Sequence, residues 1–286
     1  MKKLSVLLFA TIALANANAQ KLPNVQQRSV AAPAGVKIDG RPAEWGKFEA
    51  NNSTTELQYT IANDDKKLYL VAQTAIAEVY NRICNGGIKL IIQRSGKKSE
   101  EGAAVVKFPY QERPGEVMFN TGISRFTVTG SSITVNKEPE VKPTSVEQAD
   151  SLMKANNSKL TKNLKWIYTK GIAGIDSLIP VYNDKGIEAA AAFDNKKVYT
   201  YEIAIDLKLL GLTAANAEKF SYHLVVNGPP NKMGAMGVPT ITTVPSAGSS
   251  TGSSDMVRSL NESLSSSMAP RYATTDFWGE YILVKQ

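Results

Sequence analysis

Cysteine and histidine are almost absent from this chain, which has one of each, Cys84 and His223. A single cysteine cannot form a disulfide within the chain. Zinc motifs space several cysteine and histidine ligands at short intervals, and one residue of each kind cannot supply them. The sequence therefore predicts no metal site and no cofactor; a structural calcium held by turn carboxylates such as Asp64 is the alternative, but no calcium-loop motif supports it. It also predicts a core large enough to hold the fold without disulfides.

Groups for nucleophilic catalysis are equally scarce. A nucleophile needs a base within reach, and the one histidine lies in the apolar run 220–226. No catalytic triad can be assembled around it, so we expect His223 to be hydrogen-bonded or to face solvent. A carboxylate pair for glycoside hydrolysis stays open as an alternative, because two such carboxylates meet only in the fold.

The chain also lacks a strong charge of one sign. It has 33 Lys and Arg against 26 Asp and Glu, a net charge of +7, and the basic residues are scattered among acidic ones. This pattern is typical of a solvated surface and not of a nucleic-acid groove, which needs clustered basic residues. We therefore expect no nucleic-acid partner.

The one sustained apolar run stands at the start of the sequence. Lys2 and Lys3 precede apolar residues at 4–14, and small residues follow at 15–19. This order is typical of a secretory signal peptide at 1–19. The run is shorter than the ~20 residues that span a bilayer, so we expect cleavage before Gln20 and a mature protein that does not span the membrane; an uncleaved anchor is the alternative. Export without disulfides indicates a periplasmic or secreted protein of the bacterial envelope.

Short β-branched and aromatic runs, separated by turn residues, recur along the rest of the chain. They predict strands at 56–62, 68–74, 88–93, 126–129, 133–136, 164–169, 188–193, 198–205, 220–226 and 277–284. The regular helices that a parallel sheet requires between its strands are missing. The pattern favours an all-β fold, an antiparallel β-sandwich.

Three further segments complete the predicted organisation, in which 20–35 leads into a single domain at 36–286. Thr144 and Glu147 form a capping-box pair that predicts an inserted helix at about 144–157. The segment at about 228–270 is rich in Ser, Gly and Met, and we expect a long flexible loop before the last strand.

The domain opens on Lys37–Trp45. Val36 and Ile38 alternate with polar residues and predict a half-buried strand, and Asp39-Gly40 supplies a turn. Trp45 can then fold back on the sheet as an aromatic anchor.

The Ile38-Asp39-Gly40 and Glu44-Trp45 phrases resemble the opening of β-sandwiches like the family 9 carbohydrate-binding modules, which include DOMON-type haem-binding relatives. The segments 63–70, 199–212 and Phe277-Trp278-Gly279 are similar to later signatures of that family. The resemblance implies a jelly-roll-type sandwich in which Asp39, Gly40, Trp45 and Trp278 belong to the fold signature and both tryptophans lie in the core. It also implies that a sugar would stack on exposed aromatic rings.

Four aromatic residues are candidates for such stacking. Trp166 shares a face of its predicted strand with Leu164 and Tyr168, a face that is either core or ligand platform. Tyr80, Tyr110 and Tyr182 stand next to turn residues, as exposed stackers would. We expect a non-catalytic exported binding module with carbohydrate as its ligand. A protein-binding or scaffolding role in the envelope is the alternative; haem held by His223 and a loop methionine, or glycoside hydrolysis, comes third.

Overall fold

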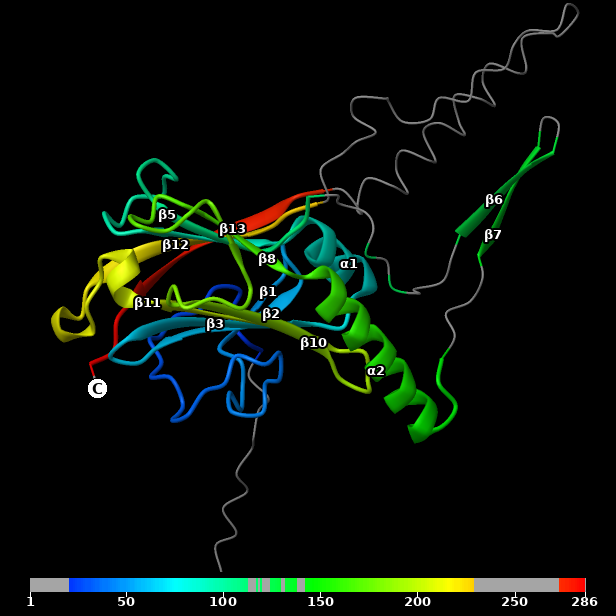
Figure 1. Cartoon of the computed structure of the whole chain (residues 1–286), viewed down its shortest axis with the longest axis horizontal. Coiled ribbons are helices and arrows are strands. Elements are labelled where there is room, and N and C mark those ends of the chain that lie inside the picture. The colour runs from blue at the N-terminus through cyan, green and yellow to red at the C-terminus, as the bar shows by residue number, and fades with distance from the viewer. Residues whose placement is uncertain are drawn as a thin grey trace, which may run out of the picture.

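Two antiparallel sheets pack face to face (Figure 1). Sheet A contains, in spatial order, β1 (Ala50–Asn52), β2 (Leu57–Asn63), β3 (Lys67–Thr74), β11 (Tyr199–Asp206) and β10 (Ile187–Phe193). Sheet B contains β13 (Thr275–Ile282), β12 (Lys219–Val226), β4 (Ile88–Gln93), β5 (Ala104–Tyr110), β8 (Trp166–Lys170) and β9 (Leu178–Pro180). A separate hairpin pairs β6 (Ser124–Thr129) with β7 (Ser132–Lys137). The predicted antiparallel β-sandwich is confirmed.

The computed structural model describes residues 21–112, 117, 119, 124–129, 132–137, 142–228 and 273–285. The predicted signal peptide and nearly all of the predicted loop at 228–270 lie outside these residues. Every strand expected from 56 onward is present. Three strands were not predicted, because β1 and β9 have three residues each and Pro109 interrupts the apolar pattern of β5.

The core lies between the sheets, where alternate residues of each strand point inward. At its centre the hydroxyl groups of Tyr59 on β2 and Tyr222 on β12 are hydrogen-bonded at 2.9 Å. The backbone N–H of Gln26 also donates to the Tyr59 hydroxyl, at 2.9 Å. Burial raises the pKa of both tyrosines. The two sheets are therefore joined by a polar contact as well as by apolar packing, which a buried hydroxyl requires.

In the described part of the chain, two α-helices accompany the sandwich. The inserted helix, α2, runs from Val146 to Asn163, and its N-cap is Ser145, whose side chain accepts from the backbone N–H of Gln148. The predicted cap, Thr144, is therefore one residue before the observed one, and the helix continues six residues beyond its predicted end at 157. The extra turns are anchored from outside the helix, because the side chain of Asn157 is bonded to the backbone of Phe193 on β10.

The second helix, α1 (Ala77–Gly86), was not predicted. Its buried residues Val79, Tyr80, Ile83 and Cys84 recur at helical spacing and close one end of the core. The helix has no side-chain N-cap, since Ile76 holds that position. A capping side chain, which marks the start of a helix in a sequence, is thus missing at α1.

The segment 31–49 covers the outer face of sheet A. Val36 and Ile38 pack there beside Trp45, but residues 36–38 are not a strand, so that prediction was wrong. Trp45 is buried as expected and meets Tyr69 edge to face, with ring centroids 5.8 Å apart. Residues 36–38 keep their inward alternation without joining a ladder, and the backbone that follows them, at Asp39 and Gly40, binds the carboxylate of Glu202.

Glu202 on β11 is fully buried and ties this covering segment to the sheet. Its carboxylate accepts from the backbone N–H groups of Asp39 (3.0 Å) and Gly40 (2.7 Å) and from the indole Nε1 of Trp45 (2.7 Å). Burial raises the pKa of Glu202, and the three hydrogen bonds oppose that shift only in part. Gly40 is required because its φ is +79° and a Cβ would lie 2.6 Å from the backbone nitrogen of Ala192.

The Glu202→Gln variant tests this contact through pH. The raised pKa means that the native state holds the Glu202 proton more tightly than the unfolded state does. The stabilising effect is therefore largest at low pH and declines as pH rises through the folded pKa. Because glutamine does not titrate, we expect the stability difference, wild type minus variant, to shrink between pH 4 and pH 7 in urea unfolding. A difference that grows with pH would contradict the raised pKa.

Candidate functional site

One of the four candidate aromatic residues is buried in the core and cannot stack on a ligand. Tyr80 lies on α1 and is 3% exposed. Its ring packs edge to face on Phe193, with centroids 5.0 Å apart, and on Phe119 at 6.0 Å. The prediction that Tyr80 is an exposed stacker was wrong, because the unpredicted helix turns this side chain into the core.

Trp166 and Tyr110 come together on the outer face of sheet B. In β8 the buried residues are Ile167 and Thr169, so Trp166 and Tyr168 point outward. Trp166 is directly opposite Tyr110 of β5, and its side chain is 37% exposed. Of the two interpretations of Trp166, the core position is therefore wrong and the surface position is correct. Leu164 precedes the strand and is buried, so it does not share this face.

A register shift between Lys107 and Tyr110 brings Tyr110 to this face. Lys107 pairs with Tyr168, and regular pairing would place residue 109 opposite Trp166. The extra residue gives Tyr110 that place instead, on the same face as Lys107. The rings of Tyr110 and Tyr168 then stack at 5.9 Å and 25°, and the Lys107 ammonium lies 5.7 Å from the Tyr110 centroid. We call Trp166, Tyr110 and Tyr168 the aromatic row.

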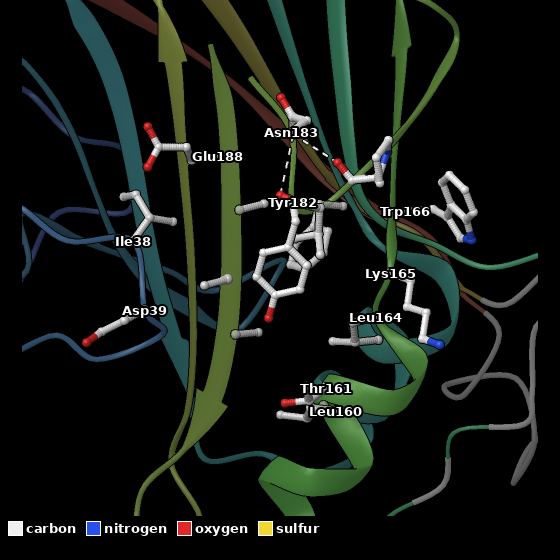
Figure 2. A pocket seen from close by; sticks show the side chains of 16 residues that line it. Ile38, Asp39, Leu160, Thr161, Leu164, Lys165, Trp166, Tyr182, Asn183 and Glu188 are labelled. Atoms are coloured by element: carbon white, nitrogen blue, oxygen red, sulfur yellow. Dashed lines mark hydrogen bonds between the residues drawn. The ribbon is translucent and has the colours of Figure 1, made fainter. Parts of the chain in front are cut away.

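Beside the row, a hollow of about 770 Å³ opens between the edges of the two sheets. Strand β10 forms one wall, the β8–β9 edge forms the other, and the end of α2 closes one side (Figure 2). Tyr182, 85% exposed, follows β9 and projects its ring into the hollow, whereas the indole of Trp166 lies on the other side of β8. Trp166 and Tyr182 thus flank the same edge without forming one platform.

Asn183 fixes the Tyr182 segment. Its side-chain Nδ2 donates to the carbonyl oxygens of Pro180 and Ile187, both at 2.9 Å. The polar rim of the hollow also includes Lys165, Asp39 and Glu188, and Glu188 forms an ion pair with Lys67. Asp39, expected only as a turn residue, therefore also borders this hollow. No sequence signal pointed to Lys165, Asn183 or Glu188, since they meet only because two sheet edges face each other.

The only histidine lies on the outer face of sheet B, at its opposite side. The His223 Nε2 atom is 2.6 Å from Asp276 Oδ2, and Nδ1 is 3.2 Å from Glu100 Oε1. The expectation of a hydrogen-bonded His223 is confirmed. With both nitrogens against carboxylates, this arrangement leaves no nitrogen for a substrate or for haem iron.

Trp278, which the family resemblance places in the core, lies on the same outer face. Its indole is partly exposed and stacks on the His223 ring at 4.3 Å and 11°. The core assignment of Trp278 was therefore wrong. In β13 the neighbouring residues Phe277 and Gly279 are buried, and strand alternation sends Trp278 outward.

Other chemistry finds little support within the described part of the chain. The Cys84 thiol is buried, which raises its pKa to about 12 and keeps it from acting as a thiolate. Over those residues, no three histidine, cysteine or carboxylate side chains gather as metal ligands would. Neither described helix has the length and apolar character needed to cross a membrane.

Comparison with known proteins adds no assignment. No family model matches the chain, and no curated protein matches its sequence.

Two tyrosine substitutions test the placement of the aromatic candidates. We expect Tyr80→Ala to lower the free energy of unfolding by about 3–5 kcal/mol, as expected for emptying a large aromatic site in the core. The matched Tyr182→Ala change removes an exposed ring and should cost less than about 0.5 kcal/mol. Denaturant unfolding of both variants measures the difference; equal losses would show that one of the two side chains is misplaced.

Proposed function

We propose that this protein is a non-catalytic binding module that takes a carbohydrate on the aromatic row. The observation that carries the proposal is the outward grouping of Trp166, Tyr110 and Tyr168 on two paired strands. Aromatic rings present flat apolar faces, against which the C–H face of a pyranose can pack. Monomers seldom leave such rings together on a surface without a binding role.

The row also has the polar neighbours that a sugar requires. The Lys107 ammonium lies over the Tyr110 ring, and burial and the charge of Lys89 lower the pKa of Lys107. Lys165 is exposed beside Trp166 and offers a second donor. Because the rings project from paired strands, little conformational entropy is lost when a ligand settles on them. These features support a preformed, shallow site, suited to a chain of sugars more than to a small enclosed ligand.

The decisive experiment is a binding screen against soluble polysaccharides and oligosaccharides, read by tryptophan fluorescence and confirmed by calorimetry. We expect saturable binding that Trp166→Ala weakens by at least about tenfold, or about 1.4 kcal/mol. The melting temperature should change little, since the side chain is 37% exposed.

Ile282→Ala is the matched control for this screen. Ile282 is an exposed apolar residue of the same sheet, 47% exposed, on its opposite edge strand. Its loss should leave sugar binding unchanged. Equal weakening by both variants, or no binding across a broad panel, would overturn the carbohydrate proposal.

We further propose that the protein is exported by the bacterial cell that makes it, after removal of residues 1–19. The basic, apolar and small-residue segments of the first nineteen positions support this. Expression of the full chain in a bacterial host should give a mature protein whose N-terminal residue is Gln20, measured by intact mass. A product that keeps Lys2 and Lys3 and stays with the membrane fraction would favour the uncleaved anchor.

A further inference from the structure

Strand β10 ends sheet A, and its free side faces the hollow. Among the residues that the structure describes, this strand pairs with β11 alone. The backbone N–H of Asp206 donates to Gly186 O (2.8 Å), and that of Asp194 donates to Val198 O (3.0 Å). In an antiparallel pair the bonding residues alternate, so the even-numbered residues between these points face β11. The N–H and C=O groups of Ala189 and Ala191 therefore point away from β11.

Both ends of this free side are already occupied by side-chain amides. At one end the Asn157 amide bonds the backbone of Phe193 twice, accepting from its N–H (2.7 Å) and donating to its carbonyl (2.9 Å). At the other end the Asn183 amide donates to Ile187 O at 2.9 Å. Each amide takes the place that a peptide group of a neighbouring strand would hold. Between them, the structure shows no partner for Ala189 or Ala191 among the residues it describes.

This gap in the ladder coincides with the wall of the hollow. Ala189 and Ala191 line it, and their small side chains allow a backbone to approach closely. An edge with unpaired amides is a template for another strand, and proteins usually protect such edges with charge, proline or a cover. The other long edge strand, β13, has Asp276 and Glu280 directed to its outer face, whereas the central residues of β10 are all alanine.

We propose that β10 is a docking edge for an extended segment of a partner polypeptide, which adds to the five strands of sheet A through Ala189 and Ala191. This proposal does not rest on the carbohydrate proposal: Trp166 borders the hollow, but its indole points away from it across β8 (Figure 2).

The surroundings of the edge specify the chemistry of the docked segment. On the side of the core, the hollow is lined by Phe108, Leu160 and Leu164, all buried apolar residues. On the opposite side, Asp39 provides an exposed carboxylate, and Glu188 provides a second one that already forms an ion pair with Lys67. Successive side chains of an added strand point to these two sides in turn. The segment therefore has apolar residues at alternate positions and at least one basic residue between them.

A separate extended segment fits this edge better than a second copy of the protein does. The edge is recessed between α2, held by Asn157, and the Tyr182 segment, held by Asn183 (Figure 2). For two copies of β10 to pair at the ~4.8 Å spacing of neighbouring strands, α2 and the Tyr182 segment of each copy would have to fit beside those of the other. A single extended chain is narrow enough to enter.

Hydrogen exchange in the free protein tests the premise. The amides of Ala190 and Ala192 bond β11 and should exchange slowly, whereas those of Ala189 and Ala191 should exchange at least about tenfold faster. Slow exchange of all four amides at every protein concentration would show that the chain covers its own edge. Protection of Ala189 and Ala191 that grows with protein concentration would identify a second copy as the occupant. Either result overturns the proposal.

Binding itself is tested with a short fluorescein-labelled peptide in which valine alternates with lysine and threonine. We expect saturable fluorescence anisotropy and new protection of the Ala189 and Ala191 amides. A peptide of the same composition with its valines contiguous should bind at least about tenfold more weakly. So should the alternating peptide with N-methyl groups on the amides that face β10, because those amides can no longer donate. Equal binding of the three peptides, or no binding of the first, would overturn the proposal.

Protein variants separate this site from the aromatic row. Ala191→Pro removes an N–H that β11 does not use, and edge strands accept proline at such positions. It should weaken peptide binding at least about tenfold and leave sugar binding unchanged, while Trp166→Ala should do the reverse. Should Ala191→Pro fail to fold, the N-methylated peptide gives the same test on the wild-type protein. Loss of both ligands in Trp166→Ala would reject two independent sites.

Discussion

The burial of β11 on both faces is the constraint on which the rest of the structure depends. Its inner face contributes Tyr199, Tyr201 and Ile203 to the main core, and its outer face carries Glu202 beneath the covering segment. A strand in this position must satisfy a buried carboxylate as well as pack apolar side chains. The three donors from Asp39, Gly40 and Trp45 meet that requirement. The segment that opens the domain therefore covers Glu202 and supplies its hydrogen-bond donors. This role explains why the alternating residues of that segment do not form a strand.

The same strand determines where binding surfaces can form. β11 is the fourth of the five strands of sheet A, so β10 beyond it is the edge strand. In sheet B, β9 is the strand at the facing edge and β8 lies next to it. A sandwich does not close on itself, so its edges leave backbone groups unpaired. The aromatic row and the hollow both lie at this side of the molecule, and Trp166 borders the hollow while its indole points away from it across β8. The fold thus concentrates two surfaces of different chemistry, one of rings and one of backbone amides, at one open margin.

Much of the fold was predictable because it follows from local pattern. Strands such as β4 and β12 have apolar residues on one or both faces over a strand's length, and their boundaries agree with the prediction to within one residue. The helix α1 was not predicted because Ile76 provides no capping side chain. The length of α2 was underestimated because its last turns depend on the contact between Asn157 and β10. Of the candidate rings, Tyr80 was misjudged because its helix was missed. The burial of Trp278 was misjudged because a short sequence motif does not tell which face of a strand is covered.

By itself, the sequence determined the class of fold, the fact that one cysteine cannot form a disulfide within the chain, and a short set of candidate aromatic residues. Periodicity, composition and turn chemistry are local properties, and these conclusions need nothing more. Only the tertiary structure decided that Trp166 and Tyr110 are neighbours, since a single extra residue in β5 sets the face on which Tyr110 lies. It alone also decided that one side of Ala189 and Ala191 has no partner within the described part of the chain. Strand order and register arise from contacts between residues far apart in the chain, and no local pattern encodes them.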